Sequence, residues 1–171
     1  MDALKHYFIP IQGLEFGIHN FDFDINESFF EHFDQSPITT SDLQVNIAVN
    51  KKPEVMGMTI NVEGTILTPC DRCLTDIHLP IKGSYPMLIK DADEPSDDID
   101  VVHVSGTQRK LFVSQFIYEF ILASVPIIKT YDCDADEPRP CDDSTLEKLD
   151  SNQDTEASNP LWDQLQNFKD N

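Results

Sequence analysis

The sequence predicts an α+β fold, in which a twisted antiparallel sheet packs against one long helix, with short helices and a flexible acidic C-terminal tail. Three observations support this prediction. Apolar and polar residues alternate in several segments, as in half-buried strands. One later segment has helical periodicity, and the composition becomes acidic and rich in turn-forming residues after Thr130. Because only one helix is long enough to join parallel strands, we expect antiparallel pairing.

The alternating segments predict a sheet of about five to seven strands, which is a usual size. The clearest pair is separated by the turn signal NKKPE, so we expect a β-hairpin there. The alternation in FGIHNFDFDI shifts by one position at Asn20, which predicts a bulge or a turn. The expected strands cover residues 4–11, 16–25, 42–49, 56–67, 74–81, 84–90 and 101–104.

Two segments predict helices. NESFFEHF begins with Asn26, a residue suited to the N-cap, and predicts a short helix. LFVSQFIYEFILASVP predicts the long helix, at residues 112–125, which Pro126 ends. Apolar residues occur on most sides of this helix, so we expect it to be packed against the sheet.

The C-terminal part of the chain predicts a boundary near residue 150. Residues 1–149 are expected to form a single α+β domain that contains the CxxC hairpin, and residues 150–171 a flexible linker with a short amphipathic segment. That segment, LWDQLQNF, carries Trp162 and Phe168. A single tryptophan after a linker is typical of a docking anchor, either on this chain's own domain or on a partner.

The charge of the chain restricts its partners. Twelve basic and 31 acidic residues give a net charge of 12 − 31 = −19. Such a surface repels a phosphate backbone and favours a basic protein, although acidity can also simply confer solubility. The basic pairs Lys51–Lys52 and Arg109–Lys110 are small for an RNA surface. The N-terminus has no signal-peptide pattern and no segment is long and apolar enough to span a membrane, so we expect a cytoplasmic protein.

The stretch TPCDRCL places Cys70 and Cys73 two residues apart between expected strands. This spacing is typical of a zinc knuckle, which needs two further ligands. Cys133 and Cys141 are the expected ligands, with His78 and His103 as substitutes. The alternatives are reduced thiols without a metal, or a redox dithiol. A redox dithiol is favoured at a helix N-terminus, and no helix is expected here.

Arg72 is a candidate partner contact, together with Trp162 and Phe168. The alternatives for Arg72 are that it lowers the pKa of a neighbouring thiol or is simply a solvated turn residue. The chain contains no Gly-rich phosphate loop, no HExxH motif and no G-x-S-x-G motif. The sequence therefore predicts no catalytic residues, and we do not expect an enzyme.

Four stretches carry a resemblance to a known family: GTILTPCDRCL, FIYEFILASVPI, CDDSTLEKL and NPLWDQLQNF. In this order they resemble the YceD family of large ribosomal RNA subunit accumulation proteins, in a Bacteroidetes-type form. The most specific mark is the CxRCL hairpin, formed here by Cys70, Arg72, Cys73 and Leu74. The closing motif departs from the family pattern, because Asn159 and Leu161 stand where relatives have Asp and Arg.

The resemblance implies a cytoplasmic role in accumulation or processing of the large-subunit ribosomal RNA, and hence in ribosome biogenesis. Combined with the charge of −19, it favours a non-enzymatic accessory factor that acts through a basic ribosomal protein or an rRNA-processing factor, with weak or absent direct RNA binding. The rivals are a direct rRNA-binding module, which would need a local basic face, and a redox protein that uses the CxxC pair.

Overall fold

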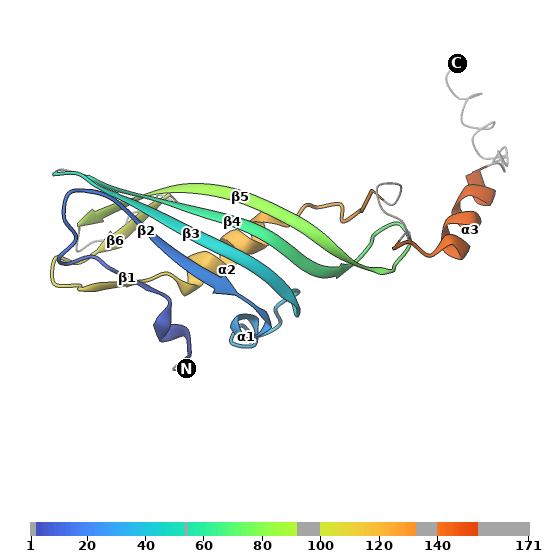
Figure 1. Ribbon diagram of the computed structural model, residues 1–171, viewed down its shortest axis with the longest axis horizontal. Coiled ribbons are helices and arrows are strands. Elements are labelled where there is room, and N and C mark those ends of the chain that lie inside the picture. Colours follow the sequence, from blue (N-terminus) through green and yellow to red (C-terminus); the bar gives the residue numbers. More distant parts are fainter. Residues whose placement is uncertain (1–2, 54, 92–99, 133–139, 154–171) are drawn as a thin grey trace, which may run out of the picture.

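The computed structural model describes residues 3–53, 55–91, 100–132 and 140–153. Over these residues the chain forms a long, curved, mostly antiparallel sheet that wraps around one helix (Figure 1). None of the helices in this part of the chain combines the length and the hydropathy needed to cross a membrane.

The main sheet has five strands in the order β2-β3-β4-β5-β6. All neighbouring pairs are antiparallel except β5 and β6, which are parallel. A second sheet of two strands pairs β1 with β7. The strands are β1 (Phe8–Pro10), β2 (Gly17–Ile25), β3 (Ser41–Lys51), β4 (Met56–Pro69), β5 (Asp76–Asp91), β6 (Val101–Val104) and β7 (Lys110–Phe112).

The alternation of the sequence explains the two faces of the main sheet, because successive side chains of a strand point to opposite faces. Leu43, Val45, Ile47 and Val49 of β3 are buried on the inner face. The outer face is polar, and its side chains bond across strands. The Asn46 amide donates to Asp22 at 2.7 Å, and the Ser84 hydroxyl donates to Asn61 at 2.7 Å.

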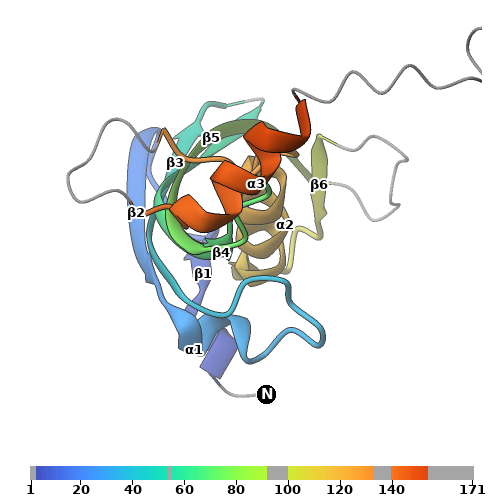
Figure 2. The same cartoon turned by 90° about the vertical axis from the view of Figure 1, so that its right-hand side faces the viewer.

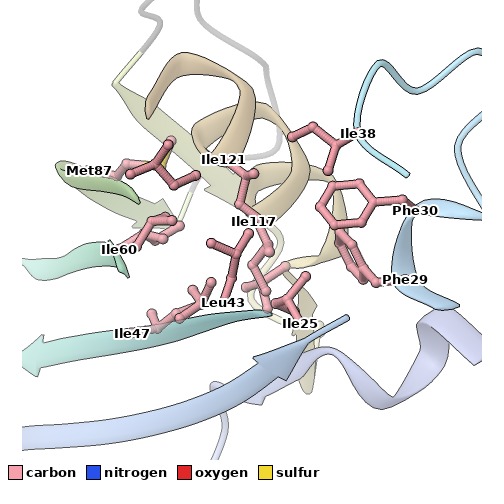
Figure 3. Packing of buried hydrophobic residues seen from close by; sticks show 14 of the residues in the cluster. Ile25, Phe29, Phe30, Ile38, Leu43, Ile47, Ile60, Met87, Ile117 and Ile121 are labelled. Carbon is pink, nitrogen blue, oxygen red and sulfur yellow. The ribbon is translucent and has the colours of Figure 1, made fainter. Parts of the chain in front are cut away.

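The helix α2 (Ser114–Ser124) lies in the concave side of the sheet, as the end-on view shows (Figure 2). Its residues Ile117 and Ile121 have no exposed surface and lie among the inner side chains of the strands (Figure 3). Near its C-terminal end, the Ser124 hydroxyl lies 3.0 Å from the Tyr85 hydroxyl of β5. A Cβ atom at Gly83 would collide with Ser124 Oγ, so glycine permits this close approach of helix and strand.

Aromatic side chains close one edge of the core. The helix α1 (Glu27–Phe30) is capped by Asn26, whose side chain accepts from the Ser28 amide at 3.1 Å. Phe29 and Phe30 of α1 are buried, and the Phe33 ring stacks on Tyr118 of α2 with centroids 4.0 Å apart. The 3₁₀ helix η1 (Ala3–His6) precedes β1. These contacts hold α1 and the segment that follows it against α2.

The predicted α+β class, the β3–β4 hairpin and the capped helix at Asn26 are confirmed. The prediction for Asn20 was wrong: β2 pairs with β3 in one unbroken register. The phase change arises because Phe16 and Ile18 are exposed, whereas Phe21 and Phe23 are partly buried against the core.

Three further expectations need correction. The two strands expected between residues 74 and 90 form the single strand β5. The strand β6 lies parallel to β5, which the antiparallel prediction did not include. The helix α2 is not the only long helix, because α3 (Asp143–Gln153) also has 11 residues, whereas the sequence predicts one long helix. Of the expected tail, residues 150–153 belong to α3 and the rest lies outside the described residues, and the domain division stays a prediction.

The buried contact of α2 with the sheet makes a first prediction. Replacing Ile117 with Ala should lower the free energy of unfolding by about 2–5 kcal/mol, because the deletion leaves a cavity among side chains that cannot fully close it. The same substitution at Ile127, whose side chain is 98% exposed, is the matched control and should have little effect. Denaturant titrations of both variants measure the difference, and equal losses would contradict the packing described.

Candidate functional site

The two free cysteines lie in the turn that joins β4 to β5, at one end of the long axis of the molecule (Figure 1). The Cys70 amide donates to the Thr75 carbonyl at 2.9 Å, and the Leu74 amide donates to the Cys70 carbonyl at 2.9 Å. Leu74 has a φ of 62°, an uncommon conformation for a non-glycine residue. This tight turn buries both sulfurs, with 1% and 3% of Cys70 and Cys73 exposed, and turns Leu74 outward.

The turn is held by the segment that follows α2. The Asp71 amide donates to the Lys129 carbonyl at 2.8 Å, and the Lys129 amide donates to the Asp71 carboxylate at 2.7 Å. This reciprocal pair joins residues that are 58 positions apart in the sequence. The position of α2 therefore also determines the position of the cysteine turn.

A third segment reaches the turn from the start of α3. Hydrogen bonds from the backbone of Thr75 and then of Asp142, together with smaller side-chain contributions, lower the pKa of Cys73 to about 7 against the opposing effect of burial. The Asp142 carboxylate accepts from the Ser144 and Thr145 hydroxyls, each at 2.8 Å, and these bonds lower the pKa of Asp142. The start of α3 is thereby fixed beside the Cys73 sulfur.

Exposed apolar side chains lie in the two segments that the Asp71–Lys129 contact joins. Leu74 is 75% exposed, Ile127 98% and Ile128 69%, and all three lie within three residues of the Asp71–Lys129 contact. We call these three residues the cysteine-turn patch. Side chains this large and this exposed are candidates for a contact with another molecule.

Two sulfur ligands for a metal are present in the turn, Cys70 and Cys73. Within the described residues, no group of three or more His, Cys, Asp or Glu side chains is arranged to hold a metal ion. Cys141 is partly buried against the core and is disulfide-bonded, so its sulfur becomes available as a thiolate only after reduction. Cys133 lies outside the described residues. The four-cysteine zinc site therefore stays a prediction.

The other predicted site residues are dispersed. Arg72 is exposed in the cysteine turn, as the sequence indicated, and His78 is exposed on β5. His103 lies on β6, where it is paired in register with Lys90 near the opposite end of β5. Trp162 and Phe168 lie outside the described residues.

Sequence reasoning missed the contributions of Lys129, Asp142 and the cysteine-turn patch. Lys129 acts through its backbone, and Asp142 acts through its backbone and as a local cap of α3. Neither role produces a recognisable side-chain motif in the sequence. The Ile127–Ile128 pair offered a signal, because it directly follows the helix-ending Pro126 and belongs to no periodic pattern.

The fold and site define an α+β protein whose buried cysteine turn is fixed by two segments that follow the central helix. A family model described as Large ribosomal RNA subunit accumulation protein YceD matches residues 58–169, more than half of the chain. The chain therefore belongs to the YceD family. Neither the curated proteins nor the solved structures include a match.

The zinc prediction can be tested on reduced protein. After treatment with a dithiol reductant and removal of excess metal, we expect about one zinc ion per chain, because a tetrahedral site takes four such ligands. Cys70→Ser and Cys73→Ser should each release the metal, whereas Ser84→Ala, on the polar face of the sheet, should not. Elemental analysis measures the stoichiometry, and metal-free wild-type protein would contradict the prediction.

The lowered pKa of Cys73 gives a separate prediction for metal-free protein. The thiolate of Cys73 should form with a midpoint near pH 7, below the range of an ordinary free cysteine, because backbone hydrogen bonds stabilise the charged form. The ultraviolet absorbance of the thiolate, taken as the difference between wild type and Cys73→Ser across a pH series, measures this midpoint. A midpoint at the ordinary value would show that these bonds do not form in solution.

Proposed function

We propose that this chain is a non-enzymatic cytoplasmic accessory factor for accumulation or processing of the large-subunit ribosomal RNA. The description of its family supports the role in large-subunit RNA accumulation. We further propose that the chain acts by binding a basic protein, either a ribosomal protein or an rRNA-processing factor.

The observation that carries the partner proposal is the cysteine-turn patch and the charge around it. The patch exposes three large apolar side chains beside a turn that two other segments hold in place. Exposed carboxylates lie in the segments that form this end of the molecule: Asp71, Asp76, Asp132, Asp142 and Asp143. An apolar centre with an acidic rim suits a partner with a lysine- or arginine-rich surface around an apolar contact.

The two parts of this surface have different physical roles. Opposite charges mainly raise the rate of association, and their effect decreases with salt over a Debye length of about 8 Å at physiological ionic strength. The apolar side chains supply affinity, because a few large buried groups dominate the binding energy of most interfaces. Arg72, Trp162 and Phe168 are proposed as further contacts of the same partner.

A redox function is the second possibility, since the pKa of Cys73 is lowered to about 7. Reactive cysteines are usually at least partly exposed, so that a substrate can reach the thiolate. Cys70 and Cys73 are both buried, and the turn is not the start of a helix. These observations favour a structural role for the pair, in which the sulfurs shape the turn that presents the patch.

The partner proposal is tested by affinity purification of the full chain after nuclease treatment, followed by direct binding to each purified large-subunit protein recovered. We expect a basic protein that remains bound without RNA. The double variant Leu74→Asn, Ile127→Asn should weaken its binding about tenfold or more, because it removes two apolar anchors. Asparagine also tolerates the positive φ at position 74.

The matched control for this variant is Ile18→Asn. Ile18 is 68% exposed on β2, outside the cysteine turn and the segments that hold it. It should bind the partner as the wild type does. Equal losses in both variants, or a partner that leaves the chain when RNA is digested, would refute the proposed surface.

A further inference from the structure

The end of the molecule opposite the cysteine turn gathers basic residues that are far apart in the sequence. Lys51 ends β3 and Lys52 follows it, Lys90 lies near the end of β5, and Arg109 directly precedes Lys110, the first residue of β7. The strand register brings β3 and β5 together, because Lys51 pairs with Met56 and Met56 pairs with Ile89. The Ile11 backbone amide donates to the Arg109 carbonyl at 3.0 Å. These five basic residues form what we call the cationic end, where β6 and the start of β2 also lie (Figure 1).

A pocket of about 660 Å³ opens at the cationic end. Its walls include the three lysines Lys51, Lys52 and Lys90, together with Gly13, Gly106 and Gln108. Arg109 and Lys110 directly follow Gln108 in the chain. Lysines that are far apart in the sequence thus line one hollow.

The loops around this pocket are held by specific hydrogen bonds. The Gln12 side-chain amide donates to the Gly106 carbonyl at 3.3 Å, and the Gln108 side-chain amide donates to the Lys110 carbonyl at 2.8 Å. The Lys51 ammonium donates to the Leu14 carbonyl at 2.8 Å, which leaves two of its three N–H groups for another acceptor. The pocket is therefore formed before any ligand arrives.

The cations of this end are available for an anion. In the described part of the chain, none of the five forms a salt bridge, whereas Lys82 on the outer face pairs with Glu63 at 3.0 Å. Lys52, Lys90 and Arg109 are exposed. Lys110 lies over the Phe8 ring, with its nitrogen 3.9 Å from the centroid.

The net charge of −19 does not prevent a local anion site. The 14 residues of β4 extend from the pocket to the cysteine turn, a length of roughly 45 Å at the usual rise per residue. This is several Debye lengths at physiological salt, so the carboxylates near the cysteine turn are largely screened at the cationic end. The nearer acids are Asp91, which ends β5 beside Lys90, and the exposed Asp100, whose carbonyl accepts from the Leu88 amide at 2.8 Å. The five cations outnumber these two carboxylates, and the segment 92–99 between them lies outside the described residues.

We propose that the cationic end binds phosphate groups of an RNA backbone. The ligand class follows from the spread of the cations over three segments, which suits several successive phosphates better than a single one. Within the described residues, no aromatic side chain lines the pocket, so contacts to the backbone rather than base stacking would provide the binding. The choice of RNA rests on the proposed function, and the chain would then join RNA at one end to a basic protein at the other.

The test compares two double variants with the same net charge. Lys52→Ala, Lys90→Ala removes two cations from the pocket, and Lys82→Ala, Lys148→Ala removes two exposed cations from the outer sheet face and from α3. Binding of the full chain to a labelled single-stranded RNA oligonucleotide is measured by fluorescence anisotropy between about 50 and 200 mM salt. Circular dichroism confirms that both variants fold.

We expect the pocket variant to bind RNA about fivefold or more weakly and to lower the slope of log K against log salt by roughly 1.4, that is about 0.7 for each phosphate that is no longer neutralised. The control variant should bind as the wild type does. Equal binding by both variants, or no salt-dependent RNA binding by the wild type, would overturn the proposal. So would competition by inorganic phosphate at the same phosphate concentration as the RNA, which would identify a small-anion site. Binding of a basic protein at the cysteine-turn patch does not depend on these lysines, so the two proposals fail separately.

Discussion

The burial of α2 in the concave side of the sheet is the contact on which the rest of the structure depends. Ile117 and Ile121 are completely buried, and the helix packs against β4 and β5, the two longest strands of the main sheet (Figure 3). A sheet that curves this strongly would expose its inner apolar face without such a helix, at a cost of about 25 cal/mol for each Å² of apolar surface. The helix therefore stabilises the curvature as well as the core.

The position of α2 also determines the cysteine turn. The chain leaves the helix at Val125 and reaches Lys129, whose backbone is bonded to Asp71 on both its amide and its carbonyl. Further along the chain, the backbone of Asp142 approaches the Cys73 sulfur. The turn between β4 and β5 is thus fixed by two segments that come after the helix, and the exposure of Leu74 follows from that constraint.

The long strands β4 and β5 separate the two candidate surfaces. Acidic groups and exposed apolar side chains lie at the cysteine turn, whereas lysines line a pocket at the other end of the same strands, where they outnumber the described acids Asp91 and Asp100. Surface charges act over about one Debye length, so each end presents its own local field to a partner. The net charge of an entire chain is a poor guide to the binding properties of a molecule this elongated.

The sequence by itself determined the α+β class, the hairpin between residues 41 and 69, the Asn26 cap and the location of the cysteine pair, because alternation, turn residues and caps are local signals. It also carried the family resemblance. Only the tertiary structure decided that Lys129 and Asp142 hold the cysteine turn, and that Lys51, Lys52 and Lys90 share a pocket. The physical reason is that these groups meet through strand register and helix packing, which depend on contacts between distant parts of the chain. Two lysines side by side in a sequence carry no information about a third that lies on another strand.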